Sequence, residues 1–474
     1  MTSSRRPHCS LLLTLVFGGG LACSSAASDG GNAAGGGGAT GGGGSKGSGG
    51  AKGQGGSGAS AAGGGGDASG GGGGGTGPAD AGAGGTGGAT GGGGEATGGA
   101  GGAAPADAGA ETSPPATGPT DLTKFKYSKA VKLNTAAAGA NVAGNVDDFP
   151  VPVVLGPASF DFTQAKDHGE DLRFAKLDGT LLPYAIESWD KAGQAAAIWV
   201  KLDHVLGGND AQSFLMYWGS ADAGDASNTK AVFDAASGFV GVWHLGEEGN
   251  SDPDGYQDAS ANEAHATGVL MAPGSRVDGR IGKGTLLQNS KEAPKEQWIK
   301  VDTDKRASFN TGAKPITVSL WALAKSFPNR STIGGYETVI SKGDTSWTLQ
   351  REGTTSHWET CVRTPPYHSC AISKSSNAVN TWFHFAIVFA NPTITLYING
   401  AKDATATDPG WLMGDHPLGL GQQTQSLNGK RNWDGILDEA RVANVGRSAD
   451  YIKLDYESQK DGQKLVSFGP VQTH

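Results

Sequence analysis

The chain has 474 residues, 81 of them glycine, and a formal net charge of −9 at pH 7. This mildly acidic balance comes with no basic stripe along the sequence, so nucleic acid is excluded as an expected partner. Most of the glycine lies before residue 121, which leaves room for two globular domains rather than the three that the length suggests.

Residues 1–22 are typical of an export signal. Arg5 and Arg6 precede the apolar run LLLTLVF, which is too short for an ordinary membrane span. The sequence GGLACSS that follows resembles a bacterial lipoprotein signal, in which Cys23 receives the lipid. The alternative is a plain secretory signal cleaved nearby. Both place the chain in the bacterial cell envelope, either lipid-anchored to the outer membrane through Cys23 or secreted.

Residues 23–121 are rich in Gly and Ala. Between residues 24 and 121 there is no Val, Ile, Leu, Met or aromatic residue. Such a segment cannot bury a core, so nothing offsets the entropy of ordering it. We expect a disordered linker with an end-to-end span of about 50–60 Å, which holds the folded part away from its anchor.

Residues 122–236 predict a first β-sandwich. Apolar runs separated by Gly, Asp and Asn are typical of strands joined by turns, and they fall at 147–155, 172–190, 196–205 and 213–224. The pieces GEDLRF, LLPYAIESWD and AIWVKL resemble an uncharacterised bacterial domain family over nearly all of this stretch. That family has no assigned activity, so the resemblance implies a fold neighbour and no function.

Residues 237–474 predict a second strand-rich domain. Its strongest predicted strands are 315–324, 337–343, 346–352, 381–390 and 391–403. Inside the last of these, Asn399-Gly400 marks a tight hairpin turn. One short helix is predicted at 448–460, with Ser448 as its N-cap. The chain is therefore expected to be all-β, with two β-sandwich domains after a disordered Gly-rich linker.

Several motifs of this second domain are similar to those of laminin-G-like, concanavalin A-like jelly-roll modules. They are GFVGVWHLGEEG, ITVSLWALA, LYINGAKD and WDGILDEARVANVGRSADYI, and the resemblance covers most of 237–460. It implies a jelly roll. Modules of this kind bind sugars or protein surfaces through loops or a concave sheet.

Asp438 and Glu439 stand side by side in the last of these motifs. Because successive side chains of a strand face opposite ways, we expect the even-numbered residues of 436–442 on one face and the odd-numbered ones on the other. This predicts a surface ion pair between Glu439 and Arg441. It also argues against catalysis, since a glycosidase needs two carboxyl groups that face the same sugar.

Asp438 on an apolar face needs a partner, because a buried carboxylate must be hydrogen-bonded, paired or metal-bound. One alternative is that it accepts backbone N–H groups of a neighbouring loop. The other, which the resemblance implies, is a structural Ca²⁺ held by Asp258 and Asp438, with Glu247 or Glu248 as a further ligand.

Cys361 and Cys370 lie close together in ETCVRTPPYHSC. Outside the cytoplasm such a pair predicts a disulfide. No CxxC motif or Cys/His cluster is evident in the sequence, so no zinc site is expected. Aromatic residues outside the predicted strands are candidates either for packing or for ligand binding; they are Trp358, Tyr367, Trp411 and Trp433.

The sequence thus predicts a surface-anchored, non-catalytic binding module for a polysaccharide or a protein ligand. The alternative is a structural or adhesive component of the cell envelope with no discrete small-ligand site. A glycan hydrolase is the least favoured function, and no catalytic residue is predicted. His384, in TWFHFAIVFA, has no nearby nucleophile and is expected to lie inside or at the edge of a sheet.

Overall fold

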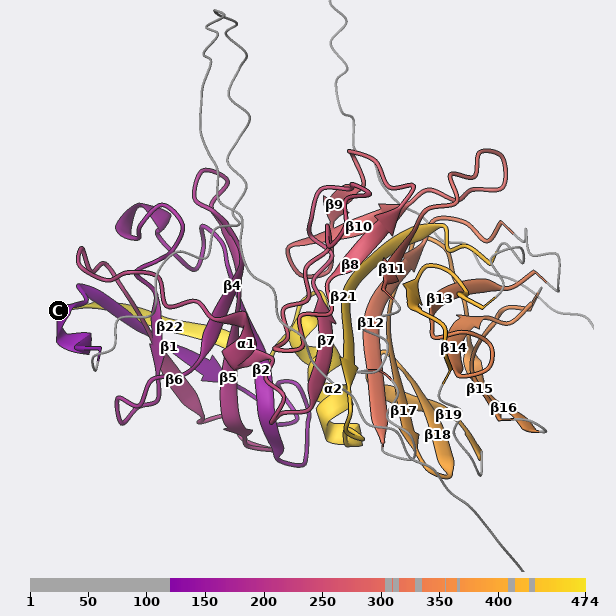
Figure 1. Ribbon diagram of the computed structural model, residues 1–474. Coiled ribbons are helices and arrows are strands. Elements are labelled where there is room, and N and C mark those ends of the chain that lie inside the picture. The colour runs from indigo at the N-terminus through magenta and orange to yellow at the C-terminus, as the bar shows by residue number, and fades with distance from the viewer. Residues whose placement is uncertain are drawn as a thin grey trace, which may run out of the picture. The chain divides into compact units, whose positions relative to one another are not determined.

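Apolar runs punctuated by Gly and Pro become strands in the computed structural model. The structure describes residues 120–302, 309, 315–328, 335–353, 355–364, 367–407, 414–425 and 431–474. The predicted signal, and all of the predicted linker except its last two residues, lie outside these ranges. The described strands form four sheets, shown in Figure 1. The prediction of an all-β chain is confirmed.

The first sandwich consists of a four-stranded and a three-stranded sheet. The four-stranded sheet has the order β22 (Val466–Thr473), β1 (Tyr127–Leu133), β6 (Ser213–Trp218) and β3 (Arg173–Ala175). The three-stranded sheet has the order β2 (Val146–Leu155), β5 (Ala195–Val205) and β4 (Tyr184–Asp190). Phe149, Val151 and Val153 alternate along β2 and are buried in the core of this sandwich. Three short helices accompany these strands: η1 (Leu122–Lys124), η2 (Phe162–Gln164) and α1 (Thr229–Val232).

The first sandwich takes its edge strand from the other end of the chain. In Figure 1 the yellow β22 lies beside the violet β1, and the two pair antiparallel from Tyr127 opposite Thr473 to Leu133 opposite Val466. The predicted second domain, residues 237–474, therefore extends too far. Its last strand belongs to the first sandwich, because the backbone of β22 forms its hydrogen bonds with β1. Strands that pair in a sheet need not be neighbours in the chain.

The second sandwich consists of an eight-stranded and a seven-stranded sheet. The eight-stranded sheet has the order β19 (Ala401–Thr407), β18 (Thr393–Ile398), β17 (Trp382–Ala390), β12 (Ile316–Ala324), β21 (Gly435–Ala443), β10 (Lys283–Leu287) and β9 (Arg276–Asp278), with β7 (Phe239–Trp243) also paired to β21. The seven-stranded sheet has the order β16 (Tyr367–Ser376), β15 (His357–Thr364), β14 (Trp347–Arg351), β13 (Glu337–Ser341), β20 (Leu418–Leu420), β11 (Trp298–Val301) and β8 (Ala266–Val269).

Two local predictions for the second domain are confirmed. Asn399 and Gly400 have φ values of 51° and 74° and form the turn between β18 and β19. Helix α2 spans Ala449–Gln459, and the side chain of its N-cap Ser448 accepts the N–H of Tyr451. In the described part of the chain, no helix is long and apolar enough to cross a membrane.

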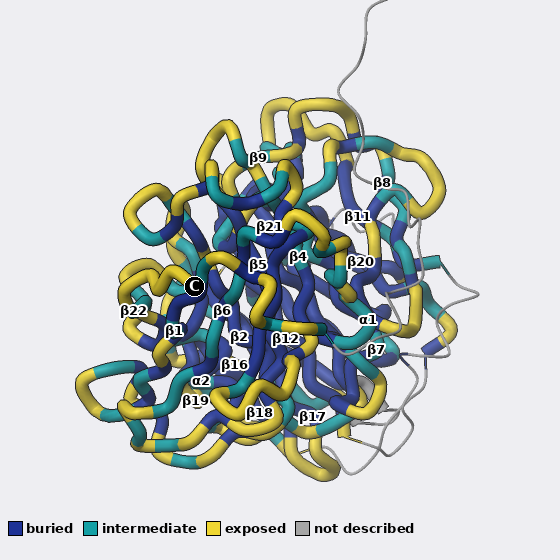
Figure 2. The backbone as a smooth tube through the Cα atoms, turned by 90° about the vertical axis from the view of Figure 1, so that its left-hand side faces the viewer, coloured by how far each residue is buried: buried dark blue, intermediate teal, exposed yellow. Residues whose placement is uncertain are grey.

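Helix α2 joins the cores of the two sandwiches. Its residues Tyr451, Ile452 and Leu454 pack in one apolar cluster with the core of the first sandwich. The same cluster contains Ala386 and Val388 from β17 of the second sandwich. Figure 2 shows buried strands in the interior and exposed loops around them. The two sandwiches are therefore in continuous apolar contact rather than joined by a loose linker.

Candidate functional site

The Asp438–Glu439 step lies in β21, where a β-bulge breaks the alternation of side chains. A single residue of β12 stands opposite two residues of β21, Glu439 and Ala440. Glu439 has a φ of 50°, a left-handed conformation that fits such an irregularity. As a result, Leu437, Ala440 and Val442 all pack in the core of the second sandwich. The prediction that even- and odd-numbered residues take opposite faces is wrong, because the extra residue shifts the phase of the strand.

Glu439 is the centre of a buried ion-pair network. Its Oε1 lies 2.7 Å from Nδ1 of His244, and its Oε2 accepts a hydrogen bond of 2.6 Å from Nη2 of Arg441. Arg441 also donates through Nη1 to Oδ1 of Asp455 in α2 at 3.1 Å. The predicted pair of Glu439 and Arg441 therefore forms, but its side chains are only 1% and 4% exposed. The prediction of a surface pair is wrong, because α2 and the first sandwich cover this side of β21.

The first sandwich contributes Glu187 and Trp199 to the network. Nε1 of Trp199 donates to Oε2 of Glu187 at 2.7 Å, and that oxygen lies 3.6 Å from Nδ1 of His244. The guanidinium of Arg441 lies 4.3 Å from the centre of the Trp199 ring. Such a cation–π contact is strongest where water is excluded. The network thus connects the two sandwiches through charge as well as through apolar packing.

The protonation states of the network follow from burial and neighbouring charge. Burial raises the pKa of Glu187 and of Asp438, and the charge of Glu439 raises both further. For Glu439 burial acts in the same direction, but His244 and Arg441 outweigh it, so its pKa is lowered. Burial opposes a charge on His244, yet Glu439 and Glu187 overcome it and raise its pKa to about 9. At neutral pH two cations, His244 and Arg441, therefore flank an ionised Glu439.

At the far end of the network, the buried His384 contacts Asp455. Its Nε2 lies 3.2 Å from Oδ2 of Asp455, and both side chains are almost fully buried. The prediction that His384 lies inside a sheet is confirmed, since it occupies β17 and pairs with Trp321 of β12. Burial raises the pKa of Asp455, but Arg441 and His384 lower it by more, so this carboxyl is also held in its ionised form.

Asp438 follows the first of its two predicted alternatives. Its Oδ2 accepts the backbone N–H groups of Arg280 and Ile281, the second at 3.0 Å. These two residues lie in the loop between β9 and β10. The other oxygen, Oδ1, is buried and has no hydrogen-bond partner among the described residues.

Asp258 and Glu247 also accept hydrogen bonds, from their own loop and from Val242 of β7. Oδ1 of Asp258 accepts two backbone N–H groups, and Oδ2 accepts one backbone N–H group and the hydroxyl of Ser260. Oε1 of Glu247 accepts the N–H of Gln257 at 2.8 Å. Within the described ranges, the oxygens of Asp258, Asp438 and Glu247 do not form a group with mutual distances below 4.8 Å. A Ca²⁺ ion shared by the three stays a prediction, and its test is given below.

The predicted ligand-binding aromatic residues fall into two groups. Trp358 and Trp433 are each 1% exposed, and their rings pack 5.9 Å apart in the core of the second sandwich. Their role in ligand binding was predicted wrongly, because a buried ring cannot stack on a ligand. Trp358 is in fact a strand residue of β15. Trp411 and the side chain of Tyr367 lie outside the described residues.

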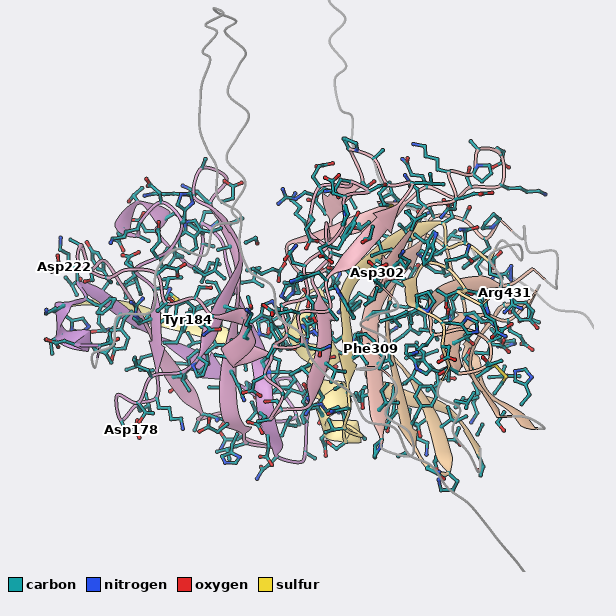
Figure 3. The ribbon with its side chains drawn as sticks, in the orientation of Figure 1. Asp178, Tyr184, Asp222, Asp302, Phe309 and Arg431 are labelled. Atoms are coloured by element: carbon teal, nitrogen blue, oxygen red, sulfur yellow. A yellow bond between two sulfur atoms is a disulfide. The ribbon has the colours of Figure 1, made fainter. Side chains whose placement is uncertain are left out.

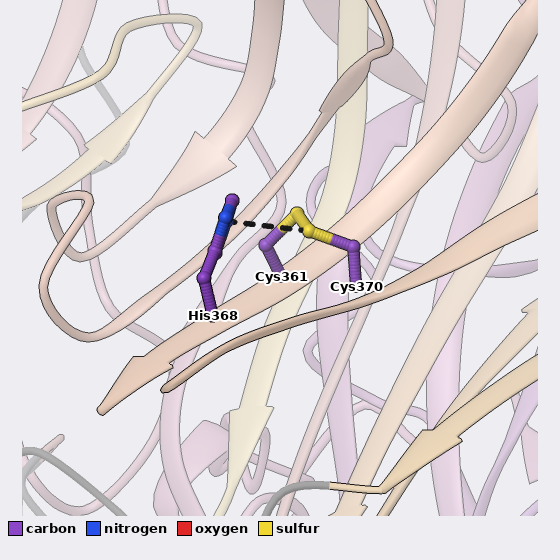
Figure 4. Close-up of side chains that lie close together, drawn as sticks. All are labelled: Cys361, His368 and Cys370. Atoms are coloured by element: carbon purple, nitrogen blue, oxygen red, sulfur yellow. Dashed lines mark hydrogen bonds between the residues drawn. A yellow bond between two sulfur atoms is a disulfide. The ribbon is translucent and has the colours of Figure 1, made fainter. Parts of the chain in front are cut away.

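The predicted disulfide between Cys361 and Cys370 is confirmed. The two cysteines are direct partners across β15 and β16. Figure 4 shows His368 beside them, with its Nε2 3.3 Å from Sγ of Cys370. The structure therefore contains a Cys/His cluster that the sequence analysis overlooked. The signal was present in YHSC, because residues two apart on a strand share a face.

The seven-stranded sheet presents polar side chains on the side away from the core. Gln350 and Glu359 are partners on β14 and β15. Because their neighbours Leu349 and Trp358 pack in the core, they point to the opposite side. The next residue across the sheet, Ile372 on the edge strand β16, is 45% exposed. We call five polar residues in contact with one another on this side the polar face; they are Tyr336, Asp344, Gln350, Glu359 and Arg431.

Hydrogen bonds connect the side chains of the polar face. Nε2 of Gln350 donates to Oε1 of Glu359 at 2.6 Å. Nη1 of Arg431, labelled in Figure 3, donates to Oδ1 of Asp344 at 2.9 Å and to Oε1 of Gln350 at 3.3 Å. The same guanidinium lies 4.9 Å from the centre of the Tyr336 ring. The polar face thus holds an amide, two carboxylates, a guanidinium and a phenol in fixed positions.

Two family models match the folded part of the chain. Residues 295–453 match the concanavalin A-like lectin/glucanases superfamily. Residues 168–245 match DUF2341, a domain of unknown function. Both resemblances found in the sequence are therefore confirmed, in the predicted order. A comparison with curated proteins finds no match.

A comparison with solved structures finds weak similarities to two toxin domains and one enzyme domain, among others. The binding domain of Paraclostridial Mosquitocidal Protein 1 is 16% identical, with 48% of this chain and 53% of that chain covered and a TM-score of 0.36. Domain 4 of an extracellular GH43 arabinanase from Geobacillus stearothermophilus, in complex with arabinotriose, is 16% identical, with 47% and 98% covered and a TM-score of 0.35. The receptor binding domain of a botulinum neurotoxin mosaic, serotype C/D, is 15% identical, with 48% and 52% covered and a TM-score of 0.35. The chain spans about half the length of both toxin domains, and similarities of this size indicate nothing about a ligand.

Proposed function

We propose that this chain, in which a concanavalin A-like domain follows a domain of unknown function, is a non-catalytic binding module displayed on the bacterial cell surface, with a polysaccharide as its ligand. The export signal, the lipid anchor at Cys23 and the Gly-rich linker would place the two sandwiches outside the cell, at the end of a flexible tether.

The observation that carries this proposal is the polar face of the seven-stranded sheet. Planar amide, carboxylate and guanidinium groups bind the hydroxyl groups of sugars, and here they are held in place by one another before any ligand arrives. A preorganised site loses less entropy on binding. Tyr336 and Asp344 are partly exposed, while Gln350, Glu359 and Arg431 are buried beneath them. A ligand would therefore approach over Tyr336 and Asp344.

The contacts of Glu439 in the Asp438–Glu439 step support a non-catalytic role. The oxygens of Glu439 are engaged by His244 and Arg441, and those side chains are buried at the junction of the two sandwiches. A carboxylate whose two oxygens are both engaged in this way is not available to attack a substrate. We therefore assign no catalytic residue.

The test is binding of the mature chain to an array of bacterial and plant polysaccharides. Tyr336→Ala and Asp344→Ala should each weaken binding to the recognised polysaccharide at least about 10-fold, a loss of about 1.4 kcal/mol. The matched control is Lys176→Ala, an exposed residue of the first sandwich, which should leave binding unchanged. The proposal fails if the parent binds no polysaccharide or if both variants bind as well as the parent. Release of reducing sugar from a bound polymer would contradict the non-catalytic assignment.

A second candidate function is a structural or adhesive envelope component. The continuous apolar cluster through α2 and the network between Glu187 and Glu439 favour it, because both connect the two sandwiches. Deletion of the gene should then increase the sensitivity of cells to detergent, even if no polysaccharide binds. Unchanged sensitivity would exclude this candidate.

A further inference from the structure

The hairpin of β15 and β16 brings two sulfur atoms and one imidazole to the same side of the seven-stranded sheet. Cys361 and Cys370 are direct partners across the hairpin, and Arg363 is the partner of His368. His368 precedes Cys370 by two residues, so the two side chains share a face. Since β16 is the edge strand of the sheet, this cluster lies at an edge, with His368 exposed and Cys361 buried.

The three potential ligand atoms are close enough to reach one ion. Sγ of Cys361, Sγ of Cys370 and an imidazole nitrogen of His368 lie within 4.8 Å of one another, as Figure 4 shows. One other group of three meets the same limit within the described ranges, namely Glu187, His244 and Glu439. In that group Glu439 already pairs with the guanidinium of Arg441. The positive charge of this guanidinium would repel a metal ion.

We propose that, once the disulfide is reduced, Cys361, His368 and Cys370 form a binding site for a thiophilic d¹⁰ cation, with Zn²⁺ as the expected ion. Zinc binds thiolate sulfur at about 2.3 Å and imidazole nitrogen at about 2.0–2.1 Å, in a tetrahedral arrangement. The Cα atoms of Cys361 and Cys370 lie 4.1 Å apart, which lets two thiolates reach one tetrahedral ion. Three protein ligands leave the fourth position to a water molecule.

The conversion between the two forms is balanced. A dithiol reductant transfers two electrons and two protons to the Cys361–Cys370 disulfide, which yields two thiols, and the reductant becomes a disulfide itself. Zn²⁺ then displaces the two thiol protons and binds two thiolates, while neutral His368 donates its lone pair. The hairpin is thus closed by a covalent bond in an oxidising compartment and by a metal ion after reduction. This site is independent of the proposed polysaccharide binding.

The test is titration of the full chain with Co²⁺, a spectroscopic substitute for Zn²⁺, without oxygen and with a phosphine reductant that offers no competing thiol. The reduced chain should bind one Co²⁺ per chain and gain sulfur-to-cobalt charge-transfer absorption, which Zn²⁺ removes. The oxidised chain should show neither. His368→Ala should weaken binding at least about 10-fold. His357→Ala is the matched control, because this histidine lies at the other end of the same hairpin, opposite Ser376.

A double variant, Cys361→Ser with Cys370→Ser, removes the site but keeps Cys9 and Cys23. It should show no charge-transfer band. All titrations are made below the melting temperature of the reduced chain, measured for each variant, so that loss of binding is not loss of the fold. The proposal is overturned if the reduced parent shows no band, if the double variant retains it, or if His368→Ala binds as tightly as His357→Ala.

Discussion

The ring of Trp199 in the first sandwich stacks on the ring of His244 in the second, with centroids 5.9 Å apart and 19° between the planes. The same imidazole pairs with Glu439 through Nδ1 at 2.7 Å. A titratable group therefore lies at the junction of the two sandwiches, in contact with both. The protonation of His244 should consequently control how firmly the sandwiches hold together.

The first prediction concerns pH. The pKa of His244 is raised from 6.5 to about 9, so the native chain binds this proton more tightly than the unfolded chain. The resulting stability, up to about 3 kcal/mol, is complete below pH 6.5 and is lost as the pH rises through 9. Urea unfolding across this range should show the decline. His244→Gln should remove most of it.

Two carboxyl groups also make the free energy of unfolding fall as the pH rises, but over a lower pH range. Glu187 and Asp438 have raised pKa values, so their contributions begin to fall above their ordinary values of 4.5 and 3.8. The comparison of the parent with His244→Gln above pH 6.5 isolates the histidine. An equal slope in both chains would show that His244 does not carry the effect.

The second prediction concerns the removal of one charge from the network. Glu439→Gln leaves Arg441 and His244 without their shared anion in a buried position, which should destabilise the fold by about 3–5 kcal/mol. The control is Asp203→Asn, whose partner Lys176 forms a pair with side chains 40% and 54% exposed. Its cost should be below about 1 kcal/mol. Similar costs for the two variants, measured by urea unfolding, would refute the special role of the buried network.

The third prediction concerns the hairpin disulfide. The bond between Cys361 and Cys370 closes a short loop, with a sequence separation of 9. Replacement of both cysteines by serine should lower the free energy of unfolding by about 2–3 kcal/mol in the chain-entropy model. Chemical reduction of the parent should lower its melting temperature in the same direction. A double variant as stable as the oxidised parent would contradict the prediction.

The fourth prediction concerns the acidic loop. Asp258→Ala removes the acceptor of four hydrogen bonds and should cost about 1–3 kcal/mol in the presence of chelator. The predicted calcium site is tested in the same experiment. If Ca²⁺ binds the native loop, it raises the melting temperature of the parent, and of Asp258→Ala by less. Coincident melting curves of the parent with Ca²⁺ and with chelator would exclude the ion.

Much of the fold could be predicted from local patterns. The apolar runs of β2 and β5, the Asn399-Gly400 turn and the Ser448 cap each depend on residues close together in the chain. The closing strand β22 could not be predicted as part of the first sandwich. Its sequence VSFGPVQT contains Gly and Pro, and its partner β1 lies at the other end of the folded part.

The candidate site was predicted only in part, for a related reason. The pairing of Glu439 with Arg441 follows from their spacing, but the bulge depends on the register with β12 and the burial depends on another domain. Glu187 and His244 stand in separate motifs, LLPYAIESWD and GFVGVWHLGEEG. Only the packing of the two sandwiches brings them together. Trp358 and Trp433 were wrongly predicted to bind a ligand. Nothing in the local sequence indicated that Trp358 lies in strand β15 or that Trp433 packs in the core.

The pairing of β1 with β22 has a consequence for biosynthesis. Among the described strands β1 is synthesised first and β22 last. The two pair with each other, and the backbone N–H of His474 bonds to the carbonyl of Lys126. Until β22 is synthesised, β1 therefore has no partner on one side, and the four-stranded sheet of the first sandwich has an unpaired edge. A prematurely terminated chain would lack β22, the edge strand of its first sandwich. The unpaired backbone groups of β1 could then pair with another chain, which leads to aggregation.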